Sequence, residues 1–257
     1  KLRLGKMIPT MPERIALAEK SKMAFEELLL LLLRDEIDRR ASTATARRAK
    51  EAGLHPDMCI ERWDETTKVT FDRRILQELL CLRFIPEGRN AVILGPVGVG
   101  KTFLATAIAH AACRHRFQVL MTRADDMLRK LKQSRMDNSR DALMIELTSV
   151  DLLVIDDFAI EPMTREESRD IYQLFVERNG RAATIITSNR DTSEWIATFD
   201  DVLLAQSAVD RFINNAYDLA VEGESYRARL KPTVDDTSPP PTTPVTKPDH
   251  PIRKRRR

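Results

Sequence analysis

Short apolar runs alternate with amphipathic stretches through the middle of the chain. The runs expected as strands are Ala91–Leu94, Phe117–Thr122, Leu152–Ile155, Thr184–Thr187 and Tyr217–Val221. Apolar residues at helical spacing predict helices over Phe71–Leu82, Phe103–Cys113, Ala124–Lys132, Ala142–Leu147, Thr164–Asn179 and Val202–Asn214. Because strands and helices alternate, the pattern predicts an α/β fold with a doubly wound parallel sheet.

The pattern of the first 66 residues is different and predicts a separate helical region. Met11–Glu19 and Phe25–Arg40 have helical periodicity, but the six leucines of Leu28–Leu33 wrap around most of the second helix. Such wrapping indicates burial against the rest of the chain or against a partner chain. The stretch Arg39–Lys50 carries five basic residues and no acid, which suits either a DNA backbone or a solvated helix face. Gly53 is expected to end the helix.

Composition divides the chain into three parts. It has 257 residues, 42% of them hydrophobic and 32% charged, and a net charge of +3. Residues 231–257 hold seven of the 13 prolines and a local charge of +4, so the rest of the chain sums to −1. The predicted domains are therefore a helical region over 1–66, an α/β domain over 67–230 and a disordered, basic tail over 231–257. Net charge alone does not indicate nucleic-acid binding.

The cysteines and the length of the apolar runs indicate a cytoplasmic protein without a membrane partner. The three cysteines Cys59, Cys81 and Cys113 are odd in number and form no C-x-x-C motif, which disfavours disulfides and zinc. The longest apolar run has six residues, far fewer than a membrane span needs. His110 and His115 lack neighbouring ligand types and are expected on a helix surface. Trp63 is expected to anchor a short connector over 60–67.

A phosphate-binding loop lies between the first predicted strand and its helix. The residues Gly95, Pro96, Val97, Gly98, Val99, Gly100, Lys101 and Thr102 fit the pattern G-x-x-x-x-G-K-[ST]. Glycines let successive backbone N–H groups point inward, and the start of the helix adds its positive dipole end. Lys101 is expected to reach the β- and γ-phosphates, and the Thr102 hydroxyl to bind Mg²⁺. The loop therefore predicts binding of ATP with magnesium.

An acidic pair follows a second buried strand. Asp156 and Asp157 come directly after Leu152–Ile155, which is expected to lie beside Ala91–Leu94 and to bring Asp156 next to Thr102. Asp156 is then expected to hold magnesium, and Asp157 to act as the base that orients the attacking water. Two acids at the end of a strand can simply face solvent, but the loop some 50 residues upstream favours the catalytic interpretation.

Three later polar residues are weaker candidates for the same site. Asn189 follows the strand Thr184–Thr187 and is able to position water, although turns commonly contain asparagine. Arg211 is a candidate arginine finger that enters the site of a neighbouring subunit, or else forms a surface salt bridge. Arg227 either reaches the phosphates of its own subunit or pairs with Glu224.

Taken in order, GPVGVGKT, LLVIDDF, TIITSNR, SEWIATFDDVLLAQSAVDRF and GESYR closely resemble the IstB-like family. These AAA+ ATPases assist insertion-sequence transposases and are similar to the DnaC helicase loader. The resemblance covers roughly residues 15–230 and implies a five-stranded AAA+ sheet and oligomers assembled on DNA. It also implies that Asn189 is the first sensor, Arg211 the finger acting across subunits and Arg227 the second sensor. Asp157 stands where many AAA+ enzymes have glutamate, so one expectation is that ATP hydrolysis is slow without a partner.

The expected function is that of an ATP-dependent transposition helper. In this interpretation a homo-oligomer binds duplex DNA and recruits a transposase, while ATP hydrolysis controls the assembly. A replicative helicase loader is an alternative, and it is expected to prefer single strands. A DNA-binding scaffold that binds ATP without hydrolysing it is the third possibility, and loss of turnover on Asp157→Asn separates it from the other two.

Overall fold

The computed structural model describes residues 4–226, and the predicted tail 231–257 lies outside them. The first part of the chain is helical and consists of η1 (Leu4–Met7), α1 (Met11–Ser21), α2 (Phe25–Glu51) and η2 (Ile60–Arg62). The α/β part contains β1 (Val69–Phe71), α3 (Arg73–Leu80), β2 (Asn90–Leu94), α4 (Lys101–Arg114), β3 (Val119–Arg123), α5 (Ala124–Ser134), α6 (Arg140–Ser149), β4 (Leu152–Asp156), α7 (Arg165–Arg178), β5 (Ala183–Ser188), α8 (Thr192–Trp195), η3 (Ile196–Thr198), α9 (Val202–Ile213) and β6 (Ala216–Gly223).

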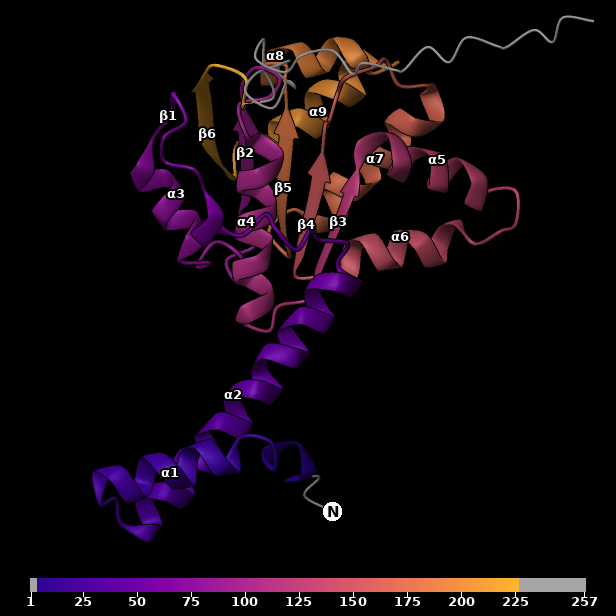
Figure 1. Ribbon diagram of the computed structural model, residues 1–257. Helices are drawn as coiled ribbons and strands as arrows, with labels where there is room; N and C mark the ends of the chain where they lie inside the picture. The colour runs from indigo at the N-terminus through magenta and orange to yellow at the C-terminus, as the bar shows by residue number, and fades with distance from the viewer. Residues whose placement is uncertain (1–3, 227–257) are drawn as a thin grey trace, which may run out of the picture.

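The strands form one sheet in the order β1-β6-β2-β5-β4-β3. The five predicted strands are present, and they pair in parallel from β6 to β3. Their carboxyl ends therefore meet at one edge of the sheet, at the top of Figure 1. In an open α/β sheet, ligands bind at this edge.

Two expectations about the sheet were wrong. A sixth strand, β1, extends the sheet in the antiparallel direction and pairs Val69 with Gly223. Phe71 belongs to this strand and not to the helix, because α3 begins only after Asp72 caps it by accepting a hydrogen bond from the Arg74 N–H. The second error concerns β4, which does not lie beside β2, because β5 is inserted between them and pairs with both.

Alternate residues of the central strands face two separate cores. Ile93, Val154 and Ile185 pack on one side with α3 and α4. On the other side, Val92 and Ile155 pack with α5, α6, α7 and α9. Because side chains alternate along a strand, continuous apolar runs are what a sheet covered on both faces requires. The sheet is thus a rigid support for the residues at its carboxyl edge.

The N-terminal region forms a helical arm, defined here as Leu4–Glu51, that projects from the α/β domain (Figure 1). Helix α2 has 27 residues, so the basic stretch continues the leucine-rich helix without a break. It ends at Glu51, two residues before Gly53, the residue expected to break the helix, which has a positive φ of 76°. Of the six consecutive leucines, only Leu32 is buried, and Leu30 is 67% exposed. Among the described residues, no helix is long and apolar enough to cross a membrane.

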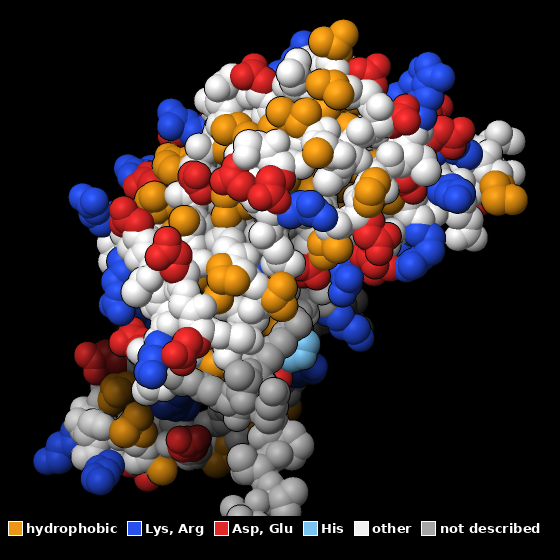
Figure 2. Space-filling view, turned by 90° about the horizontal axis from the view of Figure 1, so that it is seen from above, with side chains coloured by type: hydrophobic (Ala, Val, Ile, Leu, Met, Phe, Trp, Pro, Cys, Tyr) orange, Lys and Arg blue, Asp and Glu red, His pale blue; other side chains and the backbone are white. Residues whose placement is uncertain are grey.

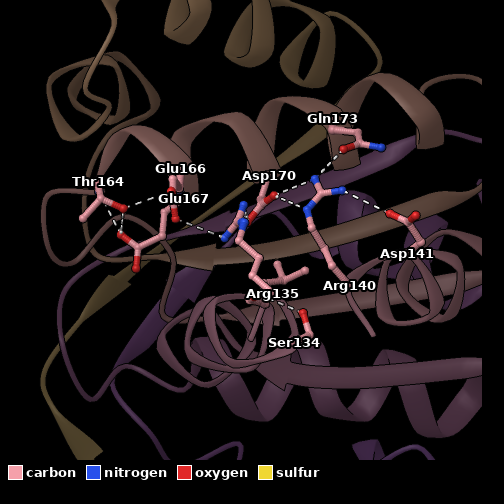
Figure 3. A network of polar contacts seen from close by, with 10 residues as sticks. Ser134, Arg135, Arg140, Asp141, Thr164, Glu166, Glu167, Asp170 and Gln173 are labelled. Carbon is pink, nitrogen blue, oxygen red and sulfur yellow. Dashed lines mark hydrogen bonds and ion pairs between the residues drawn. The ribbon is translucent and has the colours of Figure 1, made fainter. Parts of the chain in front are cut away.

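A buried charge cluster joins the α5–α6 segment to α7 (Figure 3). Asp170 of α7 has no exposed surface and accepts hydrogen bonds from Arg135 at 2.6 Å and from Arg140 at 2.7 Å. Arg140 also donates to Gln173 at 2.6 Å. A buried carboxylate is tolerated when opposite charges and hydrogen bonds surround it, so this cluster holds the two segments together.

Candidate nucleotide-binding site

The phosphate-binding loop connects the end of β2 to the start of α4. Gly95 and Gly98 have φ angles of 148° and 86°, which side chains of L-residues rarely allow. A Cβ atom on Gly95 would lie 2.0 Å from the Val221 carbonyl oxygen, and one on Gly98 would lie 2.1 Å from Ser225 Oγ. Glycine is therefore required both by the turn and by the close approach of the segment after β6. Helix α4 begins at Lys101, so its N-terminal N–H groups face the loop.

The ammonium group of Lys101 is almost completely buried within this loop. Its Nζ atom donates to the carbonyl oxygens of Gly95 and Pro96 at 2.8 and 2.7 Å. It also donates to Asn189 Oδ1 at 2.5 Å. Asn189 follows β5, which pairs directly with β2, and this pairing brings residues 88 positions apart into contact. Lys101 and Asn189 thus meet at the mouth of the loop.

Thr102 at the start of α4 and Asp156 at the end of β4 are in contact, although β5 lies between β4 and β2, the strand that leads into the loop. Thr102 Oγ1 donates to the two carboxylate oxygens of Asp156 at 2.9 and 3.1 Å. The Thr187 hydroxyl of β5 donates to the same carboxylate at 2.5 Å. Burial raises the pKa of Asp156, and the hydroxyls of Thr187 and Thr102 oppose that increase only in part.

These groups fit a magnesium ion that arrives with a nucleotide. Carboxylate and hydroxyl oxygens are hard ligands, and Mg²⁺ in nucleotide sites is held by one or two such groups together with phosphate oxygens. A nearby cation would also favour the charged form of Asp156, which burial disfavours. Thr102 and Asp156 are accordingly the residues that would hold the ion.

Asp157 is oriented differently from Asp156. Its φ of 57° is unusual for a residue other than glycine, and its backbone N–H donates to Thr187 Oγ1 at 3.0 Å. This conformation directs the second acid to the cleft described below, where its carboxylate lies 3.9 Å from Arg123 Nη2. The two adjacent aspartates therefore face different surroundings, one buried against Thr102 and the other at the cleft wall.

A cleft of about 530 Å³ lies over the loop. Residues from the predicted set that line it are Val97, Gly98, Val99, Gly100, Lys101, Thr102, Asp157 and Asn189. The rest of the lining was not anticipated and consists of Met58, Arg62, Trp63, Asp64, Thr67, Phe103, Ile160 and Tyr226. Five of these eight residues precede β1 in the chain, and four of those five lie in the stretch 60–67 that was expected to be only a connector. The one available signal was Trp63, a large aromatic residue in an otherwise polar stretch.

Of the two arginine candidates, only Arg211 is among the described residues, and it does not line this cleft. Arg211 is exposed on α9, with its guanidinium 5.9 Å from the centre of the Tyr172 ring. Arg227 lies outside the described residues. Seen from above, the carboxyl edge shows acidic, basic and apolar side chains interspersed (Figure 2). This visible face does not carry charge of a single sign.

Comparison with known proteins explains the combination of loop and sheet. Residues 1–233 match a protein family that is described as "IstB-like ATP binding protein". The chain belongs to this IstB-like family. A relative from Mycobacterium tuberculosis, named as an ATP-binding protein in an insertion sequence, is 34% identical over 233 residues, covering 90% of this chain and 92% of the relative. The ATP-binding protein of insertion sequence IS21 from Pseudomonas aeruginosa is 31% identical over 214 residues, and the match covers 83% of this chain and 81% of the relative.

Solved structures support the same fold at lower sequence identity. The match to the DnaC helicase loader covers 57% of this IstB-like chain and 85% of the DnaC chain, with a TM-score of 0.50 and 21% sequence identity. The match to DnaI covers 65% of this chain and 94% of the DnaI chain, with a TM-score of 0.55 and 22% sequence identity. The α/β domain thus has the AAA+ fold, with β1 as a strand additional to the five expected. ATP binding is consistent with the loop, with the family and with the names of the relatives.

Proposed function

We propose that this IstB-like protein is an ATPase that helps an insertion-sequence transposase. It assembles as a homo-oligomer on duplex DNA, recruits the transposase and is reset when ATP is hydrolysed. The observation that carries the proposal is the contact of Thr102 with Asp156 beside the contact of Lys101 with Asn189. These four residues surround the point where a terminal phosphate and its magnesium ion would lie.

Hydrolysis is assigned to Asp157 and its surroundings. Its carboxylate lines the cleft, while Asp156 is occupied by two hydroxyl groups, so Asp157 is the better placed acid to orient water. Asn189 supports the same water or the terminal phosphate from the end of β5. Aspartate is one methylene shorter than glutamate, so we expect turnover to depend strongly on closure of the site by a partner.

Arg211 is assigned to the site of a neighbouring subunit. Its position on the outer helix α9, away from the cleft of its own chain, supports a role across subunits. An arginine that stabilises a transferring phosphoryl group contributes about 10³–10⁵ to the rate in well-studied cases. If this role is correct, Arg211→Ala and Lys101→Ala chains are each inactive, whereas a mixture regains activity at sites that combine an intact loop with an intact arginine. A mixture that stays inactive contradicts the role.

A helicase-loader function is the second candidate, favoured by the similarity of the fold to the DnaC helicase loader. The names of the relatives, which refer to insertion sequences, favour the transposition helper. Both functions use the same nucleotide site, so the DNA substrate separates them. A helper is expected to assemble on duplex DNA, and a loader on single strands.

The decisive experiment measures assembly on the two kinds of DNA. Purified full-length protein is mixed with fluorescent duplex or single-stranded DNA of equal length, with ATP and magnesium or without nucleotide, and particle mass is followed. We expect large assemblies on duplex DNA only with ATP, and none for Lys101→Ala. Preferential assembly on single strands supports a loader. Assembly that is equal with and without nucleotide refutes control by ATP.

A further inference from the structure

One threonine at the end of β5 holds the turn that follows β4. The two strands pair in parallel as far as Ile155 and Ile186. Beyond this pair, the Thr187 carbonyl oxygen accepts a hydrogen bond from the Phe158 N–H at 2.9 Å. The Thr187 hydroxyl oxygen accepts a second one from the Asp157 N–H at 3.0 Å. Two consecutive N–H groups of the turn are therefore held by a single residue.

This turn needs such support because two of its residues have a left-handed backbone conformation. Asp157 and Ala159 have φ angles of 57° and 60°. For a residue other than glycine this conformation costs free energy, and it persists only where the surrounding structure enforces it. Thr187 supplies part of this constraint, and the Ser188 hydroxyl adds to it by donating to the Phe158 carbonyl oxygen at 2.9 Å. The direction of the Asp157 side chain thus depends on the end of β5.

The same hydroxyl group also contacts the other acid. Thr187 Oγ1 donates its hydrogen to Asp156 Oδ1 at 2.5 Å while it accepts from the Asp157 N–H. A hydroxyl has one donor and two acceptor sites, so the two contacts do not compete. Thr187 has no exposed surface and Asp156 is only 5% exposed, so bulk water does not compete for these bonds either. Thr187 links the acid assigned to magnesium with the acid assigned to the attacking water.

We propose that Thr187 is a positioning residue for ATP hydrolysis. Its hydroxyl orients the Asp156 carboxylate and holds Asp157 in the conformation that faces the cleft. The proposal rests on the ATPase function above and adds a residue that does not line the cleft, so its effect on the reaction passes through the two acids. Groups that hold a metal ligand in place commonly change metal affinity or activity 10- to 100-fold when they are removed.

The test removes the hydroxyl and keeps the branched shape of the side chain. Full-length wild type, Thr187→Val and Thr187→Ser are compared by turnover at saturating Mg-ATP with duplex DNA, and by calorimetric ATP binding at increasing magnesium concentration. For Thr187→Val we expect turnover to fall about 10- to 100-fold and half-maximal binding to need about 10-fold more magnesium. ATP affinity at saturating magnesium should stay within about twofold, because the phosphate-binding loop is unchanged. Thr187→Ser keeps the hydroxyl and should recover most of both losses.

Thr184 of the same strand provides a matched control. It is also buried, and its hydroxyl oxygen accepts a hydrogen bond from the Arg178 guanidinium at 2.9 Å. It lies near the amino end of β5, away from the two acids. We expect Thr184→Val to keep wild-type turnover and magnesium dependence, even where thermal unfolding shows that it is less stable. A similar loss of turnover in Thr184→Val would mean that the reaction needs only an intact strand, and the proposal would be wrong.

The remaining outcomes separate this proposal from the ATPase function. If the wild type hydrolyses no ATP, the ATPase function itself fails. If the wild type is active and Thr187→Val is equally active at saturating magnesium, only the role of Thr187 is wrong. Loss of activity in Thr187→Ser as large as in Thr187→Val would assign the effect to packing and would also contradict the proposal. Thr187→Ala, which places no methyl group against the Asp156 carboxylate, replaces the valine variant if that variant does not fold, with the same expectations.

Discussion

In the α/β domain a buried carboxylate is held by arginines from distant segments, whereas in the helical arm a comparable carboxylate is held by arginines of its own helix. Asp170 binds Arg135 and Arg140, which are 35 and 30 residues away. Glu36 binds Arg39 and Arg40 at 2.7 and 2.6 Å, three and four residues along α2. The first arrangement connects elements, and the second strengthens a single helix.

The same difference holds for apolar side chains. The α/β domain buries its large apolar residues in two cores, one on each face of the sheet. On the arm, Phe25, Leu30 and Ile37 are between 65% and 75% exposed. The arm is therefore stabilised by local contacts and by the packing of α1 on α2, while the domain is stabilised by tertiary contacts. Four predictions test this division.

The largest expected effect is on catalysis and is confined to the α/β domain. Asp157→Asn removes the carboxylate assigned to the attacking water, so turnover should fall about 10²- to 10⁴-fold while ATP affinity stays nearly unchanged. The measurement is steady-state hydrolysis together with nucleotide titration. Asp200→Asn, the same change at an exposed aspartate, is the matched control and should keep full activity. Normal turnover in Asp157→Asn would exclude this residue as the base.

The second prediction concerns the stability of the domain. Asp170→Ala leaves Arg135 and Arg140 without their shared carboxylate, which should lower the free energy of unfolding by about 3–5 kcal/mol. Chemical denaturation monitored by Trp195 fluorescence reports this change, because Trp195 lies in the same core as α7. Glu36→Ala is the control in the arm and should leave this transition at the wild-type midpoint. A shift for both variants would show that arm and domain unfold together.

The parts of the molecule that could be predicted from sequence have short-range determinants. The loop Gly95–Thr102 and the acids after β4 depend on glycine turns, on a helix start and on apolar runs, all within a dozen residues. The break in helical structure at Gly53 likewise follows from a local signal. The loop and the acidic pair were identified at the correct residues because no distant contact is needed to specify them, whereas α2 continues to Glu51, beyond the expected Phe25–Arg40.

The remainder depends on contacts between segments far apart in sequence. The insertion of β5 between β2 and β4 is decided by packing of the complete sheet, and β1 is a strand only because Val69 pairs with Gly223. Trp63 lines the cleft because the segment around it is held against α4 by hydrogen bonds from His110 to the His55 carbonyl oxygen and from Arg114 to Glu61. His110 is therefore buried, contrary to the expectation of a surface position. Apolar periodicity contains no information about which distant segments pair or pack with one another. The order of the strands and the residues that form the wall of the cleft could therefore not be predicted from it.

The third prediction compares two leucines of the arm. Leu32 is 8% exposed, whereas Leu30 is 67% exposed. Leu32→Ala should destabilise the arm by about 2 kcal/mol, and Leu30→Ala by less than about 0.5 kcal/mol. Hydrogen exchange of α1 and α2 amides measures both effects in the full-length protein. An equal cost for Leu30→Ala would mean that its side of the arm is covered in solution.

The smallest effect is a pH dependence of opposite sign in the two regions. Hydrogen bonds from Arg39 and Arg40 lower the pKa of Glu36 from 4.5 to about 2, so the folded state favours its charged form. Its contribution is complete above pH 4.5 and is lost as the pH falls toward 2. Burial raises the pKa of Asp156 above 3.8, so its charged form opposes folding, and stability decreases as the pH rises through the raised pKa.

Amide variants isolate each of these two contributions. The stability of the wild type relative to Glu36→Gln should increase between pH 2 and 4.5 and then remain constant. The stability of the wild type relative to Asp156→Asn should decrease as the pH rises above 3.8, because Asp156 acquires a buried charge in the wild type and the asparagine of the variant does not. Thermal unfolding of nucleotide-free protein across this range gives both differences. Glu36 is already paired with two arginines, whereas Asp156 is placed to receive a cation. If the two stability differences changed with pH in the same direction, this distinction between the two carboxylates would be wrong.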